Sequence, residues 1–138
     1  MFKAKPWWLR WFTGKGAWVT ITPNIYVPKG VDPYSYPAIV EHEKVHLRQQ
    51  EVYGKWRWLL TYLLSRQFML SQEAEGIAME LRCTALTLQP ALLRSYCLML
   101  STKDRAYETP WGGVCCDTYN EAEDAIKEAL AKFNLPTQ

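Results

Sequence analysis

Residues 37–53 read PAIVEHEKVHLRQQEVY, and this stretch sets both the expected fold and the expected chemistry. Pro37 suits the first turn of a helix, where its missing backbone N–H costs nothing. Gly54 follows the stretch and is a residue type that commonly ends helices. We therefore predict a helix that begins at Pro37 and ends at about Tyr53.

The two histidines of the chain lie four residues apart in this predicted helix, as His42-Glu43-Lys44-Val45-His46. Four residues make about one helical turn, so both imidazoles project from one face and can hold one ion. Zinc accepts neutral imidazole nitrogen readily. Glu43 lies about 100° round the helix from His42. From there its carboxylate can take a proton from a water whose pKa zinc has lowered to roughly 7.

A solvated helix face that happens to carry two histidines is the alternative interpretation. On a helical wheel the histidines share a sector with apolar residues, namely Ala38, Ile39, Val45 and Val52. The opposite sector is charged and holds Glu41, Lys44, Arg48 and Glu51. An unpaired glutamate beside the inward face would be costly, and a metal site accounts for it. The wheel therefore favours a metal site.

The third metal ligand must be a carboxylate or a thiol, because a catalytic zinc takes three protein ligands and no histidine is left. We predict a helix from Ser71 to about Leu88, before Pro90. Glu73 borders the apolar sector of this helix and is the predicted ligand. The alternatives are Glu80, two turns further along the same edge, and then Glu75, which lies on the outer face.

Gly76 lies one turn after Glu73 and would let this helix approach its neighbour closely. The alternative interpretation of Gly76 is a plain helix defect that costs about 1 kcal/mol.

Cys115 and Cys116 are adjacent, which does not match the CxxC spacing of zinc sites. We therefore expect these two cysteines to be ordinary thiols and not metal ligands.

The remaining elements are predicted from local patterns. We expect two short strands, residues 17–22 and 25–27, that form a hairpin at Pro23-Asn24, with an irregular aromatic loop as the alternative. A loop follows at 30–37. Further helices are expected at 55–66, at 90–101, and from Asn120 to about Phe133 after a loop at 111–113. The chain is thus predicted to be one α+β domain with a small N-terminal sheet.

Composition excludes several classes of protein. Apolar residues make up 49% of the 138 residues, which excludes a disordered chain. A net charge of +2 does not indicate a nucleic-acid binder, and no run of residues is apolar enough for a membrane span. The N-terminus lacks the apolar core of a signal peptide, so we expect a cytoplasmic protein with reduced cysteines. The oligomeric state is left open.

The stretch from His42 to Gln50, the helix after it, Glu73-Ala74-Glu75-Gly76 and the strand-like residues 25–28 together resemble the gluzincin metallopeptidases. The resemblance is especially to the minimal single-domain members found among bacterial and phage proteins. The resemblance implies a zincin-like α+β fold and hydrolysis of a peptide or protein substrate. It also implies zinc held by His42, His46 and Glu73, with Glu43 as the general base. An edge strand within 18–27 would align the peptide by backbone pairing.

The chain departs from the gluzincin pattern in two respects. Many gluzincins place an acidic or amide residue four positions after the ligand glutamate, where this chain has Ile77. Gln49 or a backbone carbonyl would then have to orient a histidine. No histidine is left to stabilise the oxyanion, so the candidates are tyrosines or arginines such as Tyr53, Tyr62, Tyr96 and Tyr107. Because of these two departures, a catalytically inactive domain that zinc stabilises, with a structural or interaction role, remains the alternative function.

The N-terminal run Trp7-Trp8-Leu9-Arg10-Trp11-Phe12 has two interpretations. Aromatic residues mixed with arginine favour interfaces, which suggests a membrane surface or a bound peptide. The segment is short, so we expect the three tryptophans to pack against the domain. A metal-free binding module that uses this segment is the remaining alternative function.

Overall fold

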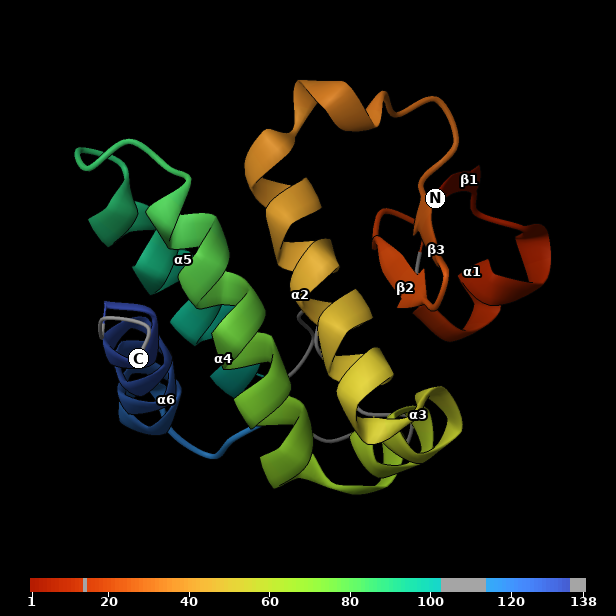
Figure 1. Cartoon of the computed structure of the whole chain (residues 1–138). Helices are drawn as coiled ribbons and strands as arrows, with labels where there is room; N and C mark the ends of the chain where they lie inside the picture. The colour runs from red at the N-terminus through yellow and green to blue at the C-terminus, as the bar shows by residue number, and fades with distance from the viewer. Residues whose placement is uncertain (14, 103–113, 135–138) are drawn as a thin grey trace.

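The computed structural model describes residues 1–13, 15–102 and 114–134, which form an α+β arrangement of a small sheet and several helices (Figure 1). The strands are β1 (Phe2–Ala4), β2 (Val19–Ile21) and β3 (Asn24–Val27). The helices are α1 (Trp7–Thr13), α2 (Pro37–Tyr53), α3 (Lys55–Leu64), α4 (Arg66–Arg82), α5 (Gln89–Ser101) and α6 (Tyr119–Asn134), with a 3-10 turn at Pro33–Ser35. The predicted loop at 111–113 lies outside the described residues.

The sheet has the strand order β1-β3-β2 among the described residues. The antiparallel pairing of β2 with β3, with Thr20 opposite Ile25, confirms the predicted hairpin. β1 runs parallel to β3, with Lys3 opposite Tyr26. The sequence did not predict β1 because its partner strand lies far along the chain, and local patterns do not report such a pairing.

The helix α2 has the predicted bounds, whereas α4 begins at Arg66 and not at Ser71. The earlier start is fixed by Ser65, whose hydroxyl accepts a hydrogen bond from the backbone N–H of Phe68 at 3.2 Å. The helix also ends at Arg82, earlier than the predicted Leu88. The N–H of Cys83 there bonds back to carbonyls of the last turn.

The second helix of the chain, α2, lies between the sheet on one side and α4 on the other (Figure 1). The main core is on the far side of α4, where α4, α5 and α6 pack around Ile77, Leu100 and Ile126. Two faces of α2 are therefore covered by different elements. One face meets β2, and the other meets α4.

Several apolar side chains that were expected inside are exposed. Trp7, Trp8 and Trp11 of α1 are exposed instead of packing against the domain, whereas Leu9 of that helix is buried. Val52 of α2, expected in the inward sector, is also exposed. Among the described residues, no helix has the length and apolar character needed to cross a bilayer.

Candidate metal centre

His42 and His46 of α2 and Glu73 of α4 form a compact, buried cluster. The Nε2 atoms of the two histidines lie 3.1 Å apart. Oε2 of Glu73 lies 3.5 Å from Nε2 of His42, and Oε1 lies 3.3 Å from Nε2 of His46. The exposed fractions are 4% for His42, 6% for His46 and 3% for Glu73. Of the three candidate glutamates, Glu73 is therefore the one that the fold brings to both histidines.

Gly76 makes the close approach of α2 to α4 possible. A Cβ atom placed on Gly76 would lie 2.6 Å from Nε2 of His42 and 2.7 Å from its Cδ2. Real Cβ atoms essentially never come that close to other heavy atoms. The His42 ring thus occupies the space where any other residue would carry its side chain, in agreement with the interpretation of Gly76 as a close-approach residue.

The Nδ1 atom of His42 faces a second carboxylate. Oε2 of Glu80 lies 3.2 Å from Nδ1 of His42, and the hydroxyl of Tyr96 donates to the same oxygen at 2.6 Å. Since an ionised carboxylate only accepts hydrogen bonds, Nδ1 must carry the hydrogen. Glu80 lies seven residues after Glu73, which is about two turns along the same helix edge. It therefore orients a histidine, the function that Ile77 cannot perform.

The Nδ1 atom of His46 is held in the same way by an amide. Oε1 of Gln49 accepts from Nδ1 of His46 at 2.9 Å. The amide nitrogen of Gln49 donates to Oε2 of Glu75 at 2.7 Å and to the carbonyl of Gln72 at 3.2 Å. Both partners are acceptors, so the orientation of the Gln49 amide is fixed. Gln49 has the orienting role that the sequence suggested, and Glu75 supports it without joining the cluster.

When both rings are neutral, each Nε2 atom is left with a lone pair that faces the other ring and the carboxylate of Glu73. Three acceptors at these distances repel one another unless a positive charge lies among them. Burial lowers the pKa of His42, but its hydrogen bonds to Glu73 and Glu80 more than offset this and raise the pKa to about 10. The cluster is therefore built around a positive charge, which bound protons or a metal ion can supply.

Tyr62 of α3 completes the surroundings of Glu73. Its hydroxyl donates to Oε1 of Glu73 at 2.5 Å, and its ring stacks on that of Trp58 with 4.6 Å between centroids. Burial, followed by the charge of Glu73, raises the pKa of Tyr62, which keeps the phenol protonated as a donor. Tyr62 was considered as an oxyanion-stabilising residue, but its hydroxyl is engaged by Glu73.

Glu43 lies on the face of α2 that meets the sheet and is held by β2. The hydroxyl of Thr20 donates to Oε2 of Glu43 at 2.6 Å. Gln50 ties the same strand to α2, because its Nε2 donates to the carbonyl of Thr20 at 2.8 Å and its Oε1 accepts from the N–H of Thr22 at 2.8 Å. Glu43 is itself buried, with an exposed fraction of 7%.

The other candidate residues lie elsewhere or have other partners. Tyr53 packs edge-on against Phe68, and Tyr96 is bonded to Glu80. Tyr107 lies outside the described residues. Cys115 and Cys116 are buried thiols: burial raises the pKa of Cys115 to about 12 and that of Cys116 to about 11. A buried thiol with such a pKa is a poor metal ligand at neutral pH.

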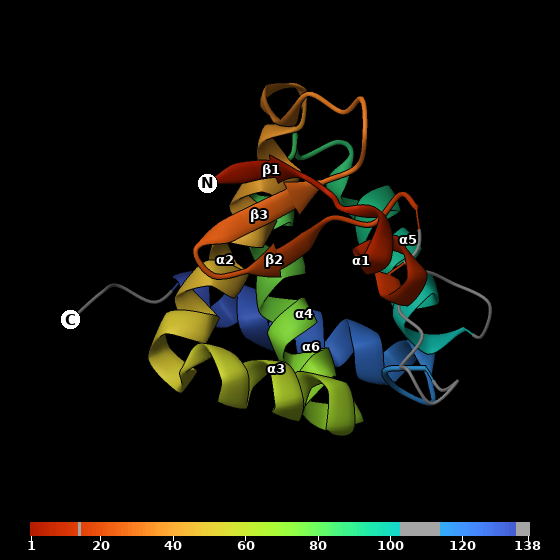
Figure 2. The same cartoon turned by 90° about the vertical axis from the view of Figure 1, so that its right-hand side faces the viewer.

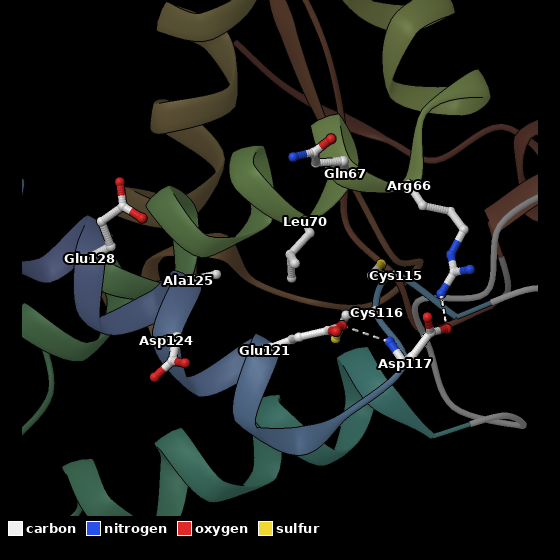
Figure 3. A pocket seen from close by; sticks show the side chains of 10 residues that line it. All are labelled: Arg66, Gln67, Leu70, Cys115, Cys116, Asp117, Glu121, Asp124, Ala125 and Glu128. Atoms are coloured by element: carbon white, nitrogen blue, oxygen red, sulfur yellow. Dashed lines mark hydrogen bonds and ion pairs between the residues drawn. The ribbon is translucent and has the colours of Figure 1, made fainter.

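A groove of about 520 Å³ runs past Cys115 and Cys116 between α4 and α6 (Figure 3). Its polar lining is mostly acidic, with Asp117, Glu121, Asp124 and Glu128. The guanidinium of Arg66 is paired with Asp117 at 2.6 Å. None of the three cluster residues lines this groove, so it is not part of the metal centre.

Comparison of the chain with family models, curated proteins and solved structures gives no match. Sequence reasoning missed the roles of Thr20 and Glu80. The two-turn spacing between Glu73 and Glu80 was a signal for the second of these, since both carboxylates lie on one helix edge.

Proposed function

We propose that the chain binds one zinc ion through His42, His46 and Glu73 and hydrolyses peptide bonds. The short distances between donor atoms carry this proposal. Two atoms that each lie about 2.05 Å from one tetrahedral zinc are about 3.3 Å apart. The two Nε2 atoms lie 3.1 Å apart, and each has a different oxygen of Glu73 beside it, Oε2 at 3.5 Å from His42 and Oε1 at 3.3 Å from His46. One ligand atom from each of the three residues lies within 4.8 Å of the other two, which supports a shared ion.

The kind of donor set supports a catalytic zinc. Two imidazoles and one carboxylate are a known set for hydrolytic zinc, and they leave a fourth position for water or substrate. When bound, zinc lowers the pKa of a coordinated water and polarises a substrate carbonyl. The order of sheet, histidine helix and glutamate helix also agrees with a zincin-like fold, which we include in the proposal.

Glu43 acts as the general base in this proposal. Its carboxylate accepts the proton of the attacking water and later delivers that proton to the leaving amine. The hydrogen bond from Thr20 fixes the position of this carboxylate. Thr20 lies on β2, an edge strand of the described sheet, so a substrate that reaches this strand would pass close to Glu43.

The substitution Glu43→Gln tests the mechanism. We expect cleavage of a peptide library, followed by mass spectrometry, to be abolished while one zinc per chain is retained. The matched control is Glu41→Gln on the same helix, because Glu41 forms only a partly exposed ion pair with Lys44 at 2.6 Å. The control should cleave normally, and the chelator-treated protein should not. Persistent cleavage by Glu43→Gln would remove Glu43 from the mechanism.

One observation favours a second function, a zinc-stabilised structural or interaction domain without turnover. All three ligands are nearly inaccessible, with His46 the most exposed of them at 6%. A substrate carbonyl has to reach the ion, whereas a structural zinc needs no access. Stoichiometric zinc, unfolding on chelation and no cleavage in any peptide library would together establish this alternative.

A further inference from the structure

Helix α3 has an apolar face that points away from the domain. Four large side chains form a stripe about 100° wide on its outer side. Their exposed fractions are 74% for Trp56, 61% for Leu60, 44% for Leu63 and 60% for Leu64. The opposite face of α3 packs inward, with Trp58 buried and Tyr62 bonded to Glu73. The helix therefore has one apolar face toward the core and a second one that is exposed.

Helix α1 repeats this arrangement with aromatic residues. Trp7, Trp8 and Trp11 fall within about 100° of one another on the helical wheel. Their exposed fractions are 72%, 48% and 85%. Leu9 points the other way and is buried. Several large exposed apolar side chains on one side of a helix are typical of interaction sites.

The segments that carry these two stripes contain only positive charges. Residues 1–31 include five Lys or Arg and no acidic residue, and residues 52–72 include three and no acidic residue. The rest of the chain then holds eight basic and 14 acidic residues, out of totals of 16 and 14. Of the eight cations, Lys5 is buried and Arg66 is paired with Asp117, while Lys3, Lys15, Lys29 and Arg57 are exposed.

Both helices lie on the same side of the molecule, the side that faces the viewer in Figure 2. We call this side the α1–α3 face; its large exposed apolar residues are Trp7, Trp8, Trp11, Trp56, Leu60, Leu63 and Leu64. We propose that the α1–α3 face docks on an anionic lipid bilayer. Tryptophan and leucine with flanking lysine and arginine are the composition of segments that bind at the membrane–water interface. The excess of positive charge is complementary to anionic headgroups.

The length of α3 determines how it would sit at the membrane. With 10 residues it is about 15 Å long, half the roughly 30 Å of a hydrocarbon core, so it lies in the plane of the interface. A second copy of the chain fits the α1–α3 face less well than an anionic bilayer does, because pairing two such faces would bring like charges together.

Flotation of the zinc-loaded full chain with lipid vesicles tests the proposal. We expect binding to vesicles of phosphatidylcholine with phosphatidylglycerol, little binding to phosphatidylcholine alone, and weaker binding as salt rises. The double variant Leu60→Ser/Leu63→Ser should bind at least about tenfold more weakly, since it removes apolar surface from the interface. Trp7→Ser/Trp11→Ser should act in the same direction.

The matched control is Leu86→Ser/Leu88→Ser, which removes two leucines that are also exposed, at 81% and 59%, but lie outside the α1–α3 face. It should bind vesicles like the unmodified chain, and circular dichroism should show all variants folded. The proposal is overturned by absence of binding to anionic vesicles, by equal binding to both vesicle types, or by an equal loss in the control. A dimer in ultracentrifugation that Leu60→Ser/Leu63→Ser dissociates would also overturn it, because a second copy would then cover the face.

Discussion

Replacing Gly76 with alanine is expected to destroy metal binding by displacing one ligand. The new Cβ atom would lie 2.6, 2.7 and 3.0 Å from three atoms of the His42 ring. Comfortable non-bonded contacts begin at about 3.5 Å, so the ring would have to move by roughly 0.9 Å from its closest contact of 2.6 Å. The tolerance of a metal–ligand distance is only about 0.2 Å. The ring is also held from its other side, by Glu80 at 3.2 Å from Nδ1.

The size of the effect follows from this displacement. Changing a residue that merely orients a ligand typically weakens metal binding by about 10- to 100-fold. Gly76→Ala moves the ligand itself, so we expect at least the upper end of that range. In an isolated helix, alanine would instead be favoured over glycine by about 1 kcal/mol. A loss of zinc affinity would therefore come from the contact with His42 and not from a weaker helix.

The assay is a competition titration of zinc against a chromogenic chelator, with circular dichroism as the check on folding. Gly16→Ala is the matched control, since a Cβ atom on Gly16 meets nothing within 4 Å. The control should bind zinc normally. If folded Gly76→Ala also binds zinc with unchanged affinity, His42 is not held against α4 as described, and the reasoning is refuted.

Three further changes probe other parts of the site. Glu80→Gln keeps an acceptor for Nδ1 of His42 but removes its charge, and should weaken zinc binding about tenfold in the same titration; unchanged affinity would show that Glu80 does not orient the ligand. Thr20→Val should lower kcat about tenfold without loss of zinc, because the carboxylate of Glu43 loses its hydrogen bond. Thr20→Ser keeps the hydroxyl and should retain the normal kcat. A valine variant with full activity would show that Thr20 does not position Glu43. When zinc is added to the metal-free protein at about 100 times the Kd for zinc, the free energy of unfolding should rise by about 2.7 kcal/mol, measured by denaturant titration. An unchanged free energy of unfolding would mean that the folded state does not bind zinc.

Local patterns predicted the helix of the two histidines but not every element around it. Pro37 and Gly54 mark the ends of α2 in the sequence, and the structure has the same bounds. The predicted start of α4, Ser71, was wrong. The apolar pattern continues on both sides of Ser65, and the helix begins directly after this one residue because its hydroxyl caps the first turn. β1 depends on a parallel partner far along the chain, which periodicity cannot report.

The candidate site was predicted residue by residue where helical geometry sufficed. The four-residue spacing of the histidines and the wheel position of Glu73 correctly indicated that these side chains meet. The contact of Thr20 with Glu43 joins a strand to a helix, so it depends on the tertiary fold. Spacing alone also could not tell that the apolar stripe of α3 points outward, because periodicity gives a stripe but not the direction in which it faces.

Anomalous X-ray scattering at the zinc edge, from crystals of the protein grown with zinc, tests the central claim most directly. The account predicts one peak, about 2.0–2.1 Å from Nε2 of both His42 and His46 and about 2.0–2.2 Å from a carboxylate oxygen of Glu73. A map with no peak among these three side chains, or with zinc bound only elsewhere on the protein, would contradict it.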